Sequence, residues 1–432
     1  MKKTYLFVVM ILCTFFISCS HGSKDNMSAL KFLDIVDAKT LYISTSSANR
    51  SARSGSETQR IFKITDDGYT EEVKYLDDGK EAITLSLQPT AIYNINSDYI
   101  FVGFGRGESI ESSYLVRKSD GAVFSMEDSG NVANIDLLKT DNNDNLYYLT
   151  YFWDDTGYGR QKIQKINLKG INVLSATTVS ASTDDVQSFE VDGNGNIIYE
   201  CFANTYGNYV CRLRKTNGSF VNNTDIGLIW VGLDGCFYHQ SNSQNDSKES
   251  EYNSETNTWT HYSYPIKKLT IDSSYNISDE IYAYIPYTDN TPFVGGYKIT
   301  VKNKIYFISE NIVEVYNSSG SPRVVTLQGL SINRIIGVSS TENFYYIAGM
   351  DSTNKTFIIK INPVDDSYTH LLTQNDYDIF SFTASETDGV IFNALRMSDG
   401  KKVIGKVGIN GGTVTMLDEE SDVKISYLER IN

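Results

Sequence analysis

Apolar residues along this chain gather in short clusters that recur at wide intervals. Each cluster follows a turn residue and holds three consecutive positions that are mostly apolar, too few for helical periodicity and typical of a buried strand. In seven of the eight copies the third position is aromatic. The copies begin at Leu41, Tyr99, Leu146, Ile197, Cys236, Ile305, Phe344 and Val390.

A second apolar cluster follows the first one in nearly every copy. Glycine, asparagine or aspartate then marks a polar turn, and another strand-like segment such as Ala122-Val123-Phe124 comes after it. In the fifth copy the second cluster is degenerate, and we assign it to residues 250–253. The regular second clusters begin at Ile61, Tyr114, Ile163, Val210, Ile312, Phe357 and Val403.

These clusters and the strand before each of them make a unit of four strands, repeated about every 50 residues, which is typical of a β-propeller. A single four-stranded sheet with two apolar faces buries them only against neighbouring sheets, so its inner strands become continuously apolar. The sequence therefore predicts an all-β fold, a single β-propeller of four-stranded antiparallel blades. We expect eight blades. Seven is the alternative, because the spacing is irregular between Leu269 and Phe293.

The N-terminus has a different pattern. Lys2 and Lys3 precede an apolar run from Tyr5 to Ile17. This run is too short to span a bilayer of about 30 Å and is typical of a signal peptide. The division predicted from this pattern is a signal peptide over 1–18, a polar tether over 19–28 and a propeller domain over 29–432.

Charge narrows the possible partners. The chain has 38 basic and 53 acidic residues, a formal net charge of −15. Removal of Lys2 and Lys3 with the signal peptide would take this to about −17, which repels nucleic acid and anionic lipid surfaces. We therefore expect no nucleic-acid partner, and contact with a membrane only through an N-terminal lipid.

The segment Phe16-Ile17-Ser18-Cys19 resembles the lipobox of bacterial lipoproteins. This resemblance implies lipidation of Cys19. Because Ser20, not aspartate, follows that cysteine, it also implies the outer membrane, on its periplasmic or cell-surface side. Together with Tyr114–Gly121 and the Asp-Gly-Asn-Gly-Asn turn at 192–196, the lipobox makes the chain similar to outer-membrane lipoproteins with a β-propeller domain in Gram-negative bacteria.

Two other likenesses are narrower. The plan is similar to the lipoprotein propeller of the β-barrel insertion machinery, whose blades mostly pair a Thr-Gly turn with tryptophan. This chain has only three tryptophans. The segment Tyr252–Trp259 resembles a kelch blade and occurs once.

Loops between the second and third strands of propeller blades gather on one face, so their residues are the candidate ligand site. An exposed tryptophan beside carboxylates and arginines suits sugar or peptide recognition. The alternative is an ordinary solvated loop with the tryptophan packed on the blade edge. The candidates are Arg53, Arg106, Trp153, Asp154, Asp155, Tyr158, Arg160 and Tyr206.

Two further patterns admit two interpretations each. Asp141–Asn145 and Asp192–Asn196 place oxygen ligands at alternate positions, as calcium loops do, but both also fit tight turns, and neither continues as an EF-hand. Cys201 and Cys211 lie on consecutive predicted strands. They form either a disulfide, in an oxidising compartment, or two buried thiols.

No catalytic motif stands out. The chain has four dispersed histidines and no Gly-x-Ser-x-Gly segment. We predict no cofactor, no metal site and no catalytic residues, and the leading hypothesis is a non-enzymatic binding or scaffolding module that recognises a protein or glycan at the cell envelope. The alternatives are a secreted glycan-active enzyme with its site on the propeller face and a structural component of an envelope assembly complex.

Overall fold

The chain divides into two compact units. Unit 1 comprises Met1–Glu127 with Ile431–Asn432, and unit 2 comprises Asp128–Arg430. The predicted signal peptide, Cys19 and the tether lie outside the described residues. The computed structural model describes residues 29–47, 57–65, 68–77, 81–106, 109–126, 133–153, 159–169, 176–203, 209–223, 226–231, 235–241, 251–255, 258–262, 265–284, 286–287, 297–302, 304–309, 312–317, 320–325, 327, 329–374, 376–420 and 423–430.

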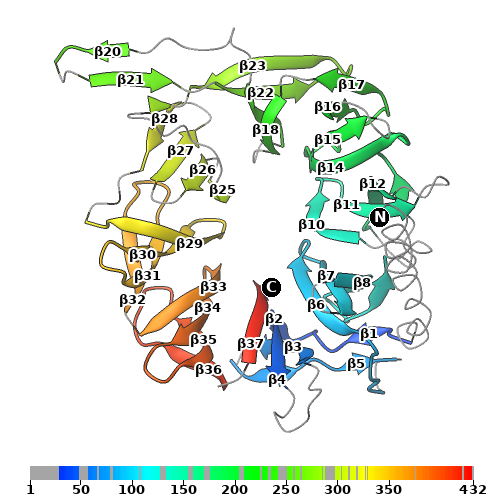
Figure 1. Cartoon of the computed structure of the whole chain (residues 1–432), viewed down its shortest axis with the longest axis vertical. Coiled ribbons are helices and arrows are strands. Elements are labelled where there is room, and N and C mark those ends of the chain that lie inside the picture. The colour runs from blue at the N-terminus through cyan, green and yellow to red at the C-terminus, as the bar shows by residue number, and fades with distance from the viewer. Residues whose placement is uncertain are drawn as a thin grey trace, which may run out of the picture. The chain divides into compact units, whose positions relative to one another are not determined.

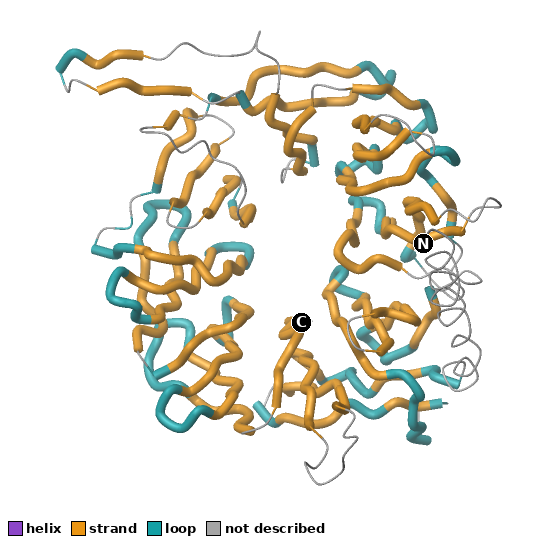
Figure 2. Tube along the Cα trace, viewed as in Figure 1, coloured by secondary structure: helices purple, strands orange, loops and turns teal. Residues whose placement is uncertain are grey.

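Strands are the only regular elements in these described ranges (Figures 1 and 2). They build eight four-stranded antiparallel sheets. The predicted all-β propeller class is therefore confirmed, with eight blades and not the alternative seven. Over the same ranges no helix is long and apolar enough to cross a membrane.

Unit 1 holds the first nine strands. The short strands β1 (Phe32–Leu33) and β5 (Tyr75–Leu76) pair with each other. Three strands of blade 1 lie in this unit: β2 (Ala38–Ser47), β3 (Glu57–Thr65) and β4 (Thr70–Glu72). Blade 2 consists of β6 (Gln88–Asn94), β7 (Tyr99–Arg106), β8 (Ser109–Arg117) and β9 (Val123–Ser125).

Unit 2 holds the other blades and the last strand, β37 (Val423–Arg430). Blade 3 consists of β10 (Ala133–Thr140), β11 (Asn145–Trp153), β12 (Gly159–Asn167) and β13 (Thr177–Thr178). Blade 4 consists of β14 (Asp184–Val191), β15 (Ile197–Ala203), β16 (Tyr209–Arg214) and β17 (Phe220–Asn223). In each of these blades the chain order is also the order across the sheet.

The remaining blades of unit 2 follow the same order except for blade 5, which combines β18 (Ile226–Val231), β19 (Phe237–Ser241), β22 (Ile266–Ile271) and β23 (Ile277–Ala283). Blade 6 has β25 (Tyr297–Val301), β26 (Lys304–Ser309), β27 (Ile312–Asn317) and β28 (Gly320–Val324). Blade 7 has β29 (Ile332–Ser340), β30 (Tyr345–Asp351), β31 (Thr356–Ile361) and β32 (Tyr368–Gln374). Blade 8 has β33 (Tyr377–Ser385), β34 (Gly389–Arg396), β35 (Lys401–Val407) and β36 (Thr415–Glu420).

The core lies between neighbouring blades, as the continuous apolar runs predict. Tyr199 packs with Leu149 and Ile163 of blade 3. The preceding residue, Ile198, packs with Phe237 and Leu269 of blade 5. Successive side chains of a strand point to opposite faces, so one blade buries apolar groups on both sides. A fully buried side chain of this kind contributes about 1.5–3 kcal/mol to stability.

Blade 5 departs from the predicted pattern. Its second cluster is not residues 250–253 but β22, which pairs directly with β19. The kelch-like segment Tyr252–Trp259 belongs to an inserted hairpin, β20 (Glu251–Asn253) and β21 (Thr258–Tyr262). Strand β21 also pairs with β24 (Pro286–Tyr287), so the insertion forms a separate three-stranded sheet. This insertion produces the irregular spacing between the fifth and sixth units.

Candidate functional site

Of the eight predicted ligand-site residues, Arg160 is the one whose side chain is described. Arg106 ends β7 and Trp153 ends β11, and only their places in the strands are given. The other five predicted residues lie outside the described ranges: Arg53, Asp154, Asp155, Tyr158 and Tyr206. The candidate site is therefore built from Arg160 and the residues around it.

Four residues beside Arg160 are linked across the ends of blades 3 and 4. Tyr151 on β11 lies opposite Gln161 on β12. The backbone N–H of Gln161 donates to the Asp185 carboxylate of blade 4, over 2.8 Å. Asp185 in turn lies opposite Phe202 on β15. Hydrogen bonding and strand pairing thus link two aromatic residues through a carboxylate, and we call Tyr151, Gln161, Asp185 and Phe202 the rim row.

The aromatic rings of the rim row are open to solvent. Tyr151 is 41% exposed and Phe202 is 43% exposed, although both lie in strands whose inner residues are fully buried. Arg160 is half-buried and donates from Nη1 to the backbone carbonyl of Thr183, over 2.9 Å. The row therefore offers apolar faces, a carboxylate and a nearby guanidinium to a ligand that carries both apolar and charged groups.

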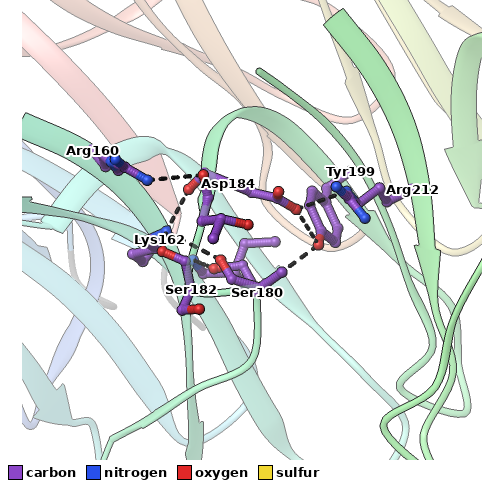
Figure 3. Close-up of polar contacts among 10 residues, drawn as sticks. Arg160, Lys162, Ser180, Ser182, Asp184, Tyr199 and Arg212 are labelled. Carbon is purple, nitrogen blue, oxygen red and sulfur yellow. Dashed lines mark hydrogen bonds and ion pairs between the residues drawn. The ribbon is translucent and has the colours of Figure 1, made fainter. Parts of the chain in front are cut away.

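Lys162, the residue after Gln161, holds the connection between β13 and β14 (Figure 3). Lys162 Nζ donates to the carbonyl oxygens of Ala181 and Ser182, over 3.1 and 2.7 Å, and to that of Asp184. Burial lowers the pKa of Lys162 below its usual value, because desolvation disfavours the charged ammonium. Three carbonyl acceptors on one buried ammonium fix this connection against blade 3.

The carboxylate of Asp184 completes the same cluster from the blade 4 side (Figure 3). It is fully buried. Its Oδ2 atom accepts from the Tyr199 hydroxyl and lies 2.9 Å from Arg212 Nε. The Tyr199 hydroxyl also accepts from the backbone N–H of Ala181. Burial raises the pKa of Tyr199, so the phenol stays protonated as the donor.

The cluster therefore gives the rim row a rigid base. Side chains on β12, β15 and β16 converge on the connection that leads into Asp184 and Asp185. Sequence reasoning found Arg160 but missed Lys162, Asp184 and Arg212, which look like ordinary surface charges when read one at a time. One sequence feature could have marked Lys162 as a buried charge. It stands next to Ile163, a predicted core position, and lysine is rarely buried unless it is paired.

Of the two interpretations of Cys201 and Cys211, the structure agrees with two buried thiols and not with a disulfide. Both residues are buried thiols. Cys201 lies opposite Val210, and Cys211 lies opposite Glu200, so their side chains point to opposite faces of blade 4. They accordingly belong to different apolar clusters. Burial raises the pKa of each thiol to about 12, which makes both poor nucleophiles.

The two calcium-like segments are hydrogen-bonded turns. Asp141 Oδ1 accepts from the backbone N–H groups of Asn143 and Asn145, and Oδ2 accepts from the side chains of Asn145 and Tyr147. Asp192 is bonded in the same way to Asn194 and Asn196. Both carboxylates are thus occupied by N–H and O–H donors, which favours the interpretation of these segments as turns.

Comparison with known proteins gives likenesses in structure only. No protein-family model matches the chain, and no characterised protein matches it in sequence. A puromycin hydrolase is 9% identical with a TM-score of 0.44, over 83% of this chain and 58% of that one. Dipeptidyl peptidase 4 of Porphyromonas gingivalis is 9% identical with a TM-score of 0.49, over 79% and 57%. The propeller domain of the Trilobed protease from Pyrococcus furiosus is 9% identical with a TM-score of 0.43, over 77% and 98%.

These similar structures correct the predicted function. They come from a hydrolase, a peptidase and a protease, and this contradicts the hypothesis of a non-enzymatic binding or scaffolding module. The two alternatives, a glycan-active enzyme and an envelope assembly component, stay predictions. The chain spans less than three fifths of the length of the puromycin hydrolase and the dipeptidyl peptidase.

Proposed function

We propose that this chain takes part in the enzymatic processing of peptides, and that the rim row receives and orients the peptide. The single observation that carries this proposal is the row itself: two exposed aromatic rings joined through Asp185, with Arg160 beside them. Peptides present apolar side chains together with charged and hydrogen-bonding groups, and this combination matches the row.

The charged groups in and beside the rim row already bind main-chain groups. Asp185 accepts from an N–H group of a neighbouring blade, and Arg160 donates to a backbone carbonyl. Both are contacts with main-chain groups, the kind of group that a peptide also offers. The row binds and orients the peptide, and none of its residues is assigned the bond-breaking step. Two of the similar proteins are named as a dipeptidyl peptidase and a protease, and peptide hydrolysis enters here only as part of the proposal.

We also propose that Cys19 carries a lipid that holds the chain at the outer membrane. The lipobox resemblance of Phe16–Cys19 and the polar segment after it support this localisation. The net charge of −15 supports attachment through the lipid alone, because the domain's acidic surface gains nothing from anionic headgroups.

Peptide turnover by the full-length protein tests the proposed function. We expect purified lipoprotein in detergent to convert members of a defined synthetic peptide pool, followed by mass spectrometry. The double variant Tyr151→Ala/Phe202→Ala should lower kcat/KM about 30-fold, since each lost aromatic contact removes roughly 1 kcal/mol of binding free energy.

The matched control is Phe380→Ala on blade 8, a residue that is 48% exposed and far along the chain from the rim row. Its kcat/KM should equal that of the native protein. The proposal fails if no peptide in the pool is converted, or if Phe380→Ala lowers kcat/KM as much as the double variant does.

A further inference from the structure

Strand β23 forms the outer edge of blade 5. Across that sheet the order is β18-β19-β22-β23, and among the described residues no strand pairs with the outer side of β23. Its pairing with β22 is regular from Ile277 to Ile281. In an antiparallel pair, alternate residues direct their N–H and C=O groups away from the partner, so β23 presents a row of backbone groups outward.

Other outer strands are protected against further pairing. Strands β4, β9, β13 and β17 have between two and four residues each. Strand β28 contains Pro322, which has no N–H group to donate. Strands β32 and β36 pair with interrupted register, at Ile358/Ile359 and Ile404/Gly405. Short edges, proline and bulges are the usual protections, whereas β23 has seven residues and a shift only at its end, between Ile266 and Lys267.

The side chains of β23 are also unusually open. Every residue from Ile277 to Ile281 is exposed. Ile277 is 37% and Ile281 is 47% exposed. Their spacing of four positions places them on one face of the strand, together with Asp279. An added strand would cover both isoleucines and bond to the outward backbone groups at the same time.

Acidic residues at the centre of β23 influence which kind of strand can pair with its outer edge. Asp279 Oδ1 lies 3.1 Å from His239 Nε2, and Oδ2 lies 3.4 Å from Lys267 Nζ, so this carboxylate is held in place. The next residue, Glu280, is exposed and lies opposite Lys268 of β22. An antiparallel pair of two β23 strands centred at either position would set one carboxylate directly against its copy, which is destabilising. The edge therefore disfavours a second copy of this chain, and the chain's net charge of −15 favours a basic segment.

We propose that β23 accepts an extended, basic peptide segment as a fifth strand of blade 5. Outward backbone groups supply the hydrogen bonds, Ile277 and Ile281 supply the apolar contact, and Glu280 supplies the charge preference. Strand addition of this kind gives affinity through the main chain and specificity through alternate side chains. The inference is independent of the rim row, which lies on other blades.

A fluorescent nonapeptide of alternating lysine and valine tests this inference by fluorescence anisotropy with the full-length protein. We expect saturable binding that the variant Glu280→Lys weakens about tenfold. The control Glu342→Lys makes the same change of charge at an exposed residue in the turn before β30. It should leave the affinity within about twofold of the native protein.

Two N-methylated forms of the probe separate strand addition from simple attraction of charges. One carries the methyl groups on its valines and the other on its lysines, so each blocks one hydrogen-bonding edge of the peptide. We expect at least one form to bind the native protein about tenfold more weakly. The inference is overturned if the parent peptide does not bind, if both methylated forms bind as well as the parent, or if the two charge variants affect binding equally.

Discussion

Burial of the Asp184 carboxylate is unfavourable by itself, and groups distant in sequence compensate for it. Arg212 supplies the opposite charge and Tyr199 supplies a hydroxyl donor, both to the Oδ2 atom. Transfer of a charge out of water is unfavourable unless pairing and hydrogen bonding compensate for it. Asp184, Tyr199 and Arg212 come from three different strands, so sequence spacing alone could not predict that this carboxylate is buried.

The variant Asp184→Asn should lower the free energy of unfolding by about 2 kcal/mol, because the half-buried Arg212 then loses its carboxylate partner. Urea unfolding followed by tyrosine fluorescence measures the change. As a control, Glu342→Gln neutralises an exposed carboxylate and should change stability by less than about 0.5 kcal/mol. Equal stability of the two variants would show that the Asp184 pair contributes nothing net.

At the scale of elements, the first turns of successive blades are bonded to one another. Asn142 in the first turn of blade 3 donates its backbone N–H to the carbonyl of Gly193 in blade 4, over 3.1 Å. Gly193 donates in turn to the carbonyl of Gly235 in blade 5, over 3.0 Å. The sequence predicted each turn from its own residues. It could not predict the bonds between turns, which depend on how the blades stack.

Alanine substitutions at Gly195 and at Gly400, a matched glycine, test how closely these turns pack. It has a φ of +86°, and a Cβ atom there would lie 2.8 Å from both Asp141 Oδ2 and the Tyr147 hydroxyl of blade 3. Gly400 has a φ of +70° with no atom within 4 Å of such a Cβ. Gly400→Ala should therefore cost about 1 kcal/mol of backbone strain, and Gly195→Ala about 1–3 kcal/mol more. Equal losses in thermal or urea unfolding would argue against tight contact between these turns.

The repeat could be predicted from the sequence because most units contain the same apolar clusters and turn residues. The first clusters of blades 3, 4 and 8 lie in β11, β15 and β34, and all their residues are buried. The fifth unit was misassigned because β20 and β21 are inserted between its second and third strands. An insertion has strand-like residues of its own, and only the pairing of β19 with β22 shows that it does not belong to the blade.

At the scale of the whole molecule, the fold class followed from the sequence and the function did not. Eight sheets with apolar faces are the consequence of a repeated pattern. The rim row, in contrast, links residues of two blades that are about 50 positions apart in the chain, through the hydrogen bond between Gln161 and Asp185. A ligand site built in this way has no sequence motif, and the loops predicted to form the site contributed one described residue, Arg160.

The proposed lipid anchor predicts how the whole molecule partitions. Replacement of the lipobox cysteine, Cys19→Ala, should release the chain from the membrane pellet into the soluble fraction, because without acyl chains the acidic domain has no affinity for anionic lipid. Fractionation with detection of the domain measures this. The matched replacement Cys236→Ala should leave the chain in the pellet. A Cys19→Ala protein that stays with the membrane would contradict the anchor.

Photo-crosslinking of the peptide pool tests whether the rim row receives the peptide. The photoreactive residue p-benzoylphenylalanine replaces Tyr151 or Phe202 in turn, and Phe380, which is similarly exposed, as the reference. The account predicts that irradiation attaches peptide at positions 151 and 202, well above the yield at 380, and that an excess of unlabelled substrate peptide suppresses the attachment. Equal yields at all three positions would contradict it.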